Sequence, residues 1–115
     1  MEKDLRQRSK QFALRIIKMF IALPKTDVAR VLGRQALRAG TSVGANYREA
    51  SRARSKAEFI SKTGDCLREA EETEYWLELL VDSGAVRPQK MAALLAETDE
   101  LIAILTTINK RAKGQ

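Results

Sequence analysis

The sequence predicts an all-α fold, an antiparallel four-helix bundle with up-down-up-down connectivity. Apolar residues recur at three- and four-residue steps in four stretches, and no stretch alternates as a strand would. Helix-starting and helix-ending residues bound these stretches. The connections are short, which makes consecutive helices antiparallel neighbours. At 115 residues the chain is expected to be a single domain, residues 1–115.

The first helix is expected over about residues 3–22. Its apolar face follows a seven-residue repeat, with Ser9 in the remaining slot, and comprises Leu5, Phe12, Ile16, Met19 and Leu23. A polar face with the same spacing comprises Arg8, Gln11, Arg15 and Lys18. Pro24 ends the run because proline cannot donate a helical hydrogen bond.

The second helix is expected over about residues 27–53, with Thr26 as its cap and Asp27 at its positive end. Its predicted seam is small and polar, and comprises Val28, Leu32, Gln35, Ala39, Ser42 or Val43, Asn46 and Ala50. Gly40 and Gly44 continue a four-residue step from Ala36. Each glycine costs about 1 kcal/mol relative to alanine inside a helix, so the spacing predicts close approach of a neighbouring backbone.

Two interpretations of Gly40 remain open. The sequence favours a second helix that is kinked but continuous. The alternative is a break at Gly40, with Thr41 capping a new helix.

The third helix, about residues 56–83, starts at Ser55 in a Ser-Lys-Ala-Glu capping box and ends at Gly84. Its seam comprises Phe59, Thr63, Cys66, Ala70, Thr73, Leu77 and Leu80. The fourth helix, about residues 88–111, starts at Pro88, which suits a first helical turn. Its seam comprises Met91, Leu94 or Leu95, Thr98, Leu101, Leu105 and Ile108.

Composition narrows the class of protein. The N-terminus, MEKDLRQRSK, has no apolar signal core, and no stretch approaches the ~18 apolar residues of a membrane span, so we expect a cytoplasmic protein with no membrane partner. The single cysteine, Cys66, is expected to be a small core residue.

The charge is polarised along the chain. The formal net charge is +6, but residues 1–25 and 26–57 each carry seven basic residues against two acidic ones. Residues 58–86 carry eight acidic residues against two basic ones, and residues 87–115 return to an excess of two basic residues. A basic first half and an acidic third helix are complementary between copies of the chain, which favours head-to-tail contacts.

One set of motifs resembles a known family. These are Leu23-Pro24-Lys25, the stretch from Gln35 to Asn46 (QALRAGTSVGAN), Glu49, Ser51-Arg52 and Glu58-Phe59. They resemble the four-helix bundle proteins encoded in intervening sequences of bacterial 23S ribosomal RNA genes, and roughly residues 5–108 can be aligned with that family. The chain departs from the family at Tyr47-Arg48-Glu49-Ala50, where a family glycine is absent.

The resemblance implies a small cytosolic bundle that forms closed homo-oligomeric rings, pentamers in particular, with a mostly unassigned molecular function. A more distant resemblance, in architecture and basic charge, is to the accessory proteins of diversity-generating retroelements, which work with a reverse transcriptase and bind nucleic acid.

The sequence lacks residues that enzymes commonly use for catalysis. Histidine is absent, which removes the commonest general base and the Glu-x-x-His metal motif of helical bundles. Glu69 and Glu72 share one helical face, and Glu71, Glu74 and Glu78 share another, so a carboxylate metal site is geometrically possible. We expect instead a solvated or salt-bridged acidic face, no enzyme activity, no metal and no cofactor.

The candidate contact residues are basic. The set that can align along the second helix comprises Arg34, Arg38, Arg48 and Arg52, and Arg8, Arg15 and Lys18 extend it on the first. Guanidinium groups suit phosphates if they face solvent; the alternative is pairing with acidic residues of the third helix or of another subunit. Aromatic residues are only 5%, too few for a base-stacking platform, so any nucleic-acid binding would be backbone-directed.

Four further residues are candidates for structure or interface. Asn46 and Glu49 lie beside the arginines, and a polar residue on a tight seam often fixes register or bonds a neighbouring helix. Tyr75 and Trp76 lie on the acidic helix, and Trp76 is interpreted equally as a core residue or as the anchor of a subunit interface.

Two functions follow. The first is a non-enzymatic homo-oligomeric scaffold or adaptor for a protein or nucleoprotein partner. The second is backbone-directed RNA or DNA binding by the basic faces of the first two helices and the tail at Lys110, Arg111 and Lys113.

Overall fold

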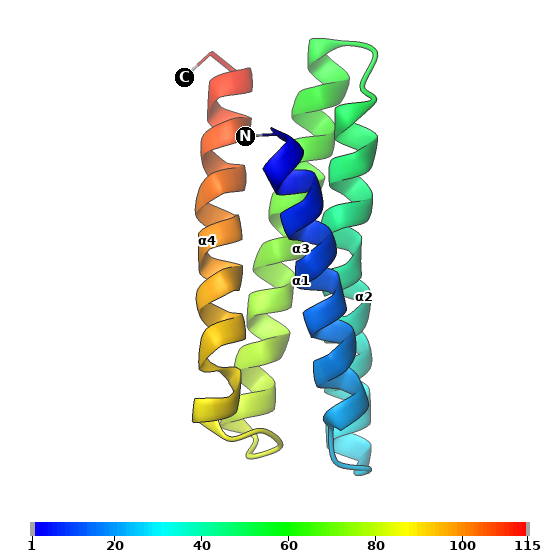
Figure 1. Cartoon of the computed structure of the whole chain (residues 1–115), viewed down its shortest axis with the longest axis vertical. Coiled ribbons are helices and arrows are strands. Elements are labelled where there is room, and N and C mark those ends of the chain that lie inside the picture. The colour runs from blue at the N-terminus through cyan, green and yellow to red at the C-terminus, as the bar shows by residue number, and fades with distance from the viewer. Residues whose placement is uncertain (1, 115) are drawn as a thin grey trace.

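Four helices pack side by side along one long axis (Figure 1). The computed structural model describes residues 2–114, with side chains from Asp4 onward. No β-strand occurs within that range. The helices are α1 (Glu2–Ala22), α2 (Asp27–Ser51), α3 (Lys56–Asp82) and α4 (Pro88–Ala112). The bundle measures 45 × 20 × 20 Å. The predicted all-α four-helix bundle is confirmed.

Local capping explains where the helices begin. The Thr26 hydroxyl accepts from the Ala29 amide at 3.2 Å, and the Ser55 hydroxyl accepts from the Glu58 amide at 3.0 Å. Pro88 occupies the first turn of α4, where its missing amide hydrogen is not needed. Gly84 follows α3 with a φ of +85°, a left-handed conformation that ends a helix and favours glycine.

Helix α2 is continuous from Asp27 to Ser51, so the alternative of a break at Gly40 is wrong; the kink stays a prediction. The close approach predicted from the glycine spacing is confirmed. A Cβ on Gly40 would lie 2.7 Å from Cγ1 of Ile16, and one on Gly44 would lie 3.3 Å from the Ser9 hydroxyl. The two glycines therefore let the backbones of α1 and α2 approach each other.

The buried face of α2 differs from the predicted seam. It comprises Ala29, Gly33, Ala36, Ala39, Gly40, Val43, Gly44, Tyr47 and Ala50. Val28, the first residue of the predicted seam, is 56% exposed. Ala39, Val43 and Ala50 of the predicted seam are buried, but the rest of the buried face is formed by neighbouring small residues, because α1 packs against the glycine positions. Tyr47 then fills the remaining space and is 1% exposed.

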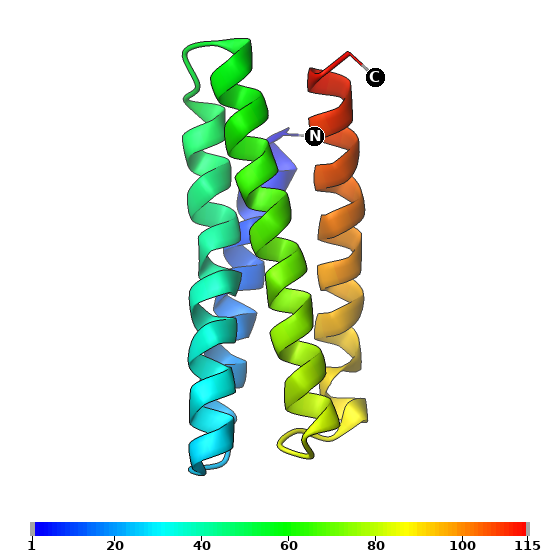
Figure 2. The ribbon, with the colours of Figure 1, turned by 180° about the vertical axis from the view of Figure 1, so that it is seen from behind.

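The helices are arranged in chain order around the core. Packing joins α1 to α2, α2 to α3 and α3 to α4. The chain direction reverses at each connection in Figure 1, and Figure 2 shows α2, α3 and α4 from the opposite side. Helices α1 and α4 pack less closely, and two cavities open along the seam between them.

In the described part of the chain, no helix is long and apolar enough to span a membrane.

Candidate interaction surfaces

Residues that could carry chemistry do not converge. Within residues 4–114 no group of three or more Cys, Asp or Glu side chains is placed to hold a metal ion. Glu69 and Glu72, one of the two acidic groups noted in the sequence, both bind Arg38 across the α2–α3 interface. Cys66 is fully buried, and burial raises the pKa of its thiol to about 12. A thiol with that pKa is a poor nucleophile at neutral pH.

The arginine stripe on α2 is divided. Arg38 donates to Glu69 at 3.4 Å and to Glu72. Arg34, Arg48 and Arg52 are exposed, and none forms an ion pair with any residue that the structure describes. Pairing with the acidic residues of α3 therefore accounts for one arginine of the stripe.

The basic residues of α1 have two different environments. Arg8 binds Glu97 of α4 through two hydrogen bonds of 2.7 Å and Glu100 through one of 3.1 Å. These bonds raise the pKa of Arg8 and lower that of Glu97. Arg15 and Lys18 instead line a cavity between α1 and α4.

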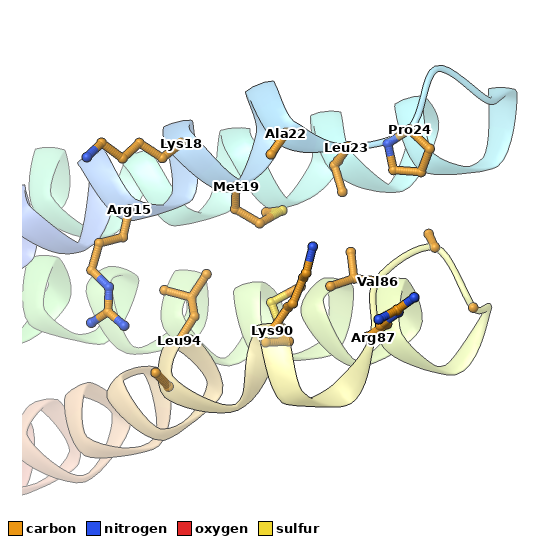
Figure 3. Close-up of a pocket in the computed structure, with 14 residues that line it drawn as sticks. Arg15, Lys18, Met19, Ala22, Leu23, Pro24, Val86, Arg87, Lys90 and Leu94 are labelled. Carbon is orange, nitrogen blue, oxygen red and sulfur yellow. The ribbon is translucent and has the colours of Figure 1, made fainter.

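This cavity, called here the cationic pocket, has a volume of about 840 Å³ (Figure 3). Its lining comprises Arg15, Lys18, Met19, Ala22, Leu23, Pro24, Gly84, Ala85, Val86, Arg87, Lys90, Met91, Ala93 and Leu94. Four of these residues are cations and none is acidic. In Figure 3, Lys90 reaches from α4 toward α1, and Met19 points from α1 into the same space. Cations therefore surround an apolar floor.

Sequence reasoning missed Arg87 and Lys90. They lie about seventy residues from Arg15 and Lys18, and only the packing of α4 beside α1 brings the two pairs together. The excess of basic residues in residues 87–115 was a weak signal, since it did not say which helix α4 would meet.

The opposite charge gathers where α3 meets α4. Glu74 of α3 lies beside Asp99 of α4, and a hydrogen bond to Asp99, burial and the nearby carboxylates of Glu78 and Glu71 raise the pKa of Glu74 to about 7. No Lys or Arg occurs in residues 69–82 of α3 or in residues 91–109 of α4. The acidic side chains there are consequently not neutralised by their own helices.

Tyr75 and Trp76 have different surroundings. Tyr75 is 53% exposed, and its ring lies edge-on to that of Trp76 at a centroid distance of 5.2 Å. By helical spacing it shares a face of α3 with Glu71 and Glu78. Trp76 is half-buried against the core, and its indole nitrogen has no hydrogen-bond partner among the described residues. The exposed aromatic side chain of this pair is therefore Tyr75.

The polar candidates on α2 have separate contacts. Glu49 accepts from Lys62 of α3 at 2.9 Å. Asn46 is half-buried and makes no side-chain hydrogen bond to the described residues. The buried amide that joins two helices is Asn109, which donates to the Ile60 carbonyl at 3.0 Å and to the Thr63 hydroxyl at 2.9 Å. Its place four residues after Leu105 was the sequence signal for it.

The chain resembles known proteins over nearly its whole length. A family model described as 23S rRNA-intervening sequence protein matches residues 1–107. The chain is 38% identical to a protein of unknown function from the S23 ribosomal protein family of Bacteroides thetaiotaomicron VPI-5482. The crystal structure of that protein superposes with a TM-score of 0.88, covering 96% of this chain and 99% of the other. No curated protein matches the chain.

The motifs quoted from residues 23–59 and the matched bundle structure agree. The resemblance seen in the sequence is confirmed, and the chain belongs to the 23S rRNA-intervening sequence protein family.

Proposed function

We propose that the protein is a non-enzymatic homo-oligomeric scaffold that assembles head to tail. One observation carries this proposal: each chain has a cationic surface and an acidic surface that form no ion pairs with the residues that the structure describes. The acidic surface comprises Glu71, Glu74, Glu78 and Asp99. The cationic pocket has no acidic lining residue, and the acidic surface at the α3–α4 boundary raises the pKa of Glu74 to about 7. Contact between copies would neutralise both surfaces.

The shape of the assembly follows from these positions. The cationic pocket spans α4 and α1, whereas the acidic surface spans α3 and α4. Because the two surfaces differ, their contact is heterologous, and repeated heterologous contacts close into a ring when the rotation permits. The family resemblance implies a pentameric ring, which could organise a protein or nucleoprotein partner.

The test is the mass of the purified protein by size exclusion with light scattering, in low and in high salt. We expect an assembly that weakens as salt screens the charged contacts. The 260/280 absorbance ratio of the same peak reports any co-purified nucleic acid. A monomer at all protein concentrations in low salt would contradict the scaffold.

A second function is backbone-directed RNA or DNA binding, and the exposure of Arg34, Arg48 and Arg52 favours it. These guanidinium groups lack carboxylate partners among the described residues and can reach phosphates. The discriminating experiment exchanges all four arginines of the stripe for Gln. Loss of nucleic-acid retention with unchanged mass would support this second function, and dissociation of the assembly would place the stripe in the scaffold interface.

A further inference from the structure

We infer that the cationic pocket is the docking site for the acidic surface of a second copy of this chain, with Tyr75 inserted into the pocket as the anchor. The inference rests on the proposed homo-oligomer and names its contact. The docking surface, called here the Tyr75 patch, comprises Tyr75, Glu71, Glu74, Glu78 and Asp99.

The pocket offers an apolar floor surrounded by positive charge. Met19, Leu23 and Leu94 are among its apolar residues, and its four cations form no ion pair with any described residue. Its volume of about 840 Å³ lies within the roughly 300–1,000 Å³ of binding pockets. An occupant must therefore bring an apolar group together with several negative charges.

The Tyr75 patch has that composition. Tyr75 is 53% exposed, and Glu71 and Glu78 lie four residues before and three residues after it, on the same face of α3. The hydrogen bond to Asp99, burial and the nearby carboxylates of Glu78 and Glu71 raise the pKa of Glu74 to about 7. None of the four acidic side chains of the patch forms an ion pair with a described residue. Tyrosine is common as an interface anchor because it has an apolar ring and a polar hydroxyl.

The two surfaces lie at the same level of the bundle. The pocket is formed by the end of α1 and the start of α4, and the patch lies in the second half of α3, toward the same end (Figures 1 and 2). In a ring whose axis runs along the bundles, contacting surfaces of neighbouring copies must lie at one level. The pocket and the patch meet this requirement.

The two surfaces also lie on adjacent sides of the bundle, since both include α4. The pocket faces outward between α4 and α1, and Glu74 meets Asp99 between α3 and α4. Opposite sides would propagate a straight filament, whereas adjacent sides turn each copy relative to the last and favour a closed ring. The same contact thus explains association and closure.

The experiment reverses charge on each surface and then on both. Arg87→Glu/Lys90→Glu changes the pocket, and Glu71→Lys/Glu78→Lys changes the patch; all four side chains are exposed, so the fold should persist. We expect each pair alone to give a monomer by light scattering at a concentration where the unchanged chain assembles. Combining the two pairs in one chain should restore assembly, because the charges are complementary again.

Two further variants sharpen the test. Tyr75→Ala should raise the dissociation constant of the assembly about tenfold or more if the aromatic side chain of Tyr75 is the anchor. Lys110→Glu/Lys113→Glu, at the far end of α4, changes charge equally and should leave the mass unchanged; circular dichroism checks folding of every variant.

The outcomes separate the two claims. If the unchanged chain is monomeric, the scaffold and this contact are both wrong. If it assembles and the pocket or patch reversals leave its mass unchanged, the scaffold stands and this contact is overturned. Failure of the combined variant to assemble, with each half dissociated, would also overturn the pairing of these two surfaces.

Discussion

Arg8 on α1 holds both carboxylate oxygens of Glu97 on α4, with its Nε and Nη2 atoms each 2.7 Å from an oxygen. The two residues are 89 positions apart in the sequence. Along the α1–α4 seam they separate the cationic pocket from a second cavity of about 500 Å³ that Leu5, Phe59 and Ile108 help to line. This charged contact thus joins α1 and α4 at a point between the two cavities, where the helices pack less closely.

We expect Arg8→Ala to lower the free energy of unfolding by about 1–2 kcal/mol, because it leaves a partly buried carboxylate without its bidentate partner. Urea denaturation of wild type and variant at pH 7 measures the loss. Arg8→Lys keeps the charge but not the two-pronged geometry, so it should recover only part of the stability. Equal stability of all three proteins would contradict a structural role for the pair.

The same contribution should depend on pH. The pKa of Glu97 is lowered from its ordinary value of 4.5, chiefly by the hydrogen bond from Arg8. A lowered folded-state pKa adds stability that is present above the unfolded value and is lost as pH falls through the folded value. The difference between wild type and Arg8→Ala should therefore shrink below about pH 4.

Glu74→Gln should stabilise the dissociated chain at alkaline pH. The folded-state pKa of Glu74 is raised from 4.5 to about 7, so folding favours its protonated form. The contribution of Glu74 to the stability of the folded state is therefore fully present below about pH 4.5, and it is lost as pH rises from about 4.5 through about 7. At about pH 8.5 we expect a gain on the order of 1 kcal/mol after screening by solvent, vanishing below about pH 4.5. Denaturation at low protein concentration measures it; a gain that did not vary with pH would contradict the assignment.

Gly40→Ala should destabilise the bundle although alanine favours helix. The new Cβ would lie 2.7 Å from Cγ1 of Ile16, in the tight α1–α2 contact. Overpacking of this kind costs about 1–3 kcal/mol and outweighs the ~1 kcal/mol of helix propensity. Gly64→Ala is the matched control, because the nearest atoms to its Cβ are 3.8 Å away. Denaturation midpoints should move in opposite directions for the two variants.

Cys66 should react with thiol reagents only when the bundle opens. The side chain is 0% exposed, and burial raises the thiol pKa to about 12. Labelling with a maleimide should be slow in native buffer and fast in denaturing urea, since the thiolate is the reactive form. Rapid labelling of the native protein would show that the core near α3 opens readily.

Much of the fold could be predicted from local patterns. Thr26, Ser55 and Pro88 mark helix starts through contacts within a single turn, and the seam of α3 from Thr63 to Leu80 is buried as predicted. These features depend on neighbours a few residues away, so the sequence contains the information directly. Family membership could also be predicted, from the motifs between residues 23 and 59.

The buried face of α2 and the candidate surfaces required the tertiary structure. Val28 is exposed and Tyr47 is buried because α2 packs the face that carries Gly40 and Gly44 against α1. The spacing of residues within one helix does not determine which neighbouring helix that face contacts. Spacing within a helix likewise could not predict that Arg8 binds Glu97, or that Arg15 and Lys90 line the same pocket. Helical period and caps are set by local geometry, so the sequence alone determined them; charge placement between helices depends on packing over long sequence separations, and only the folded bundle decided it.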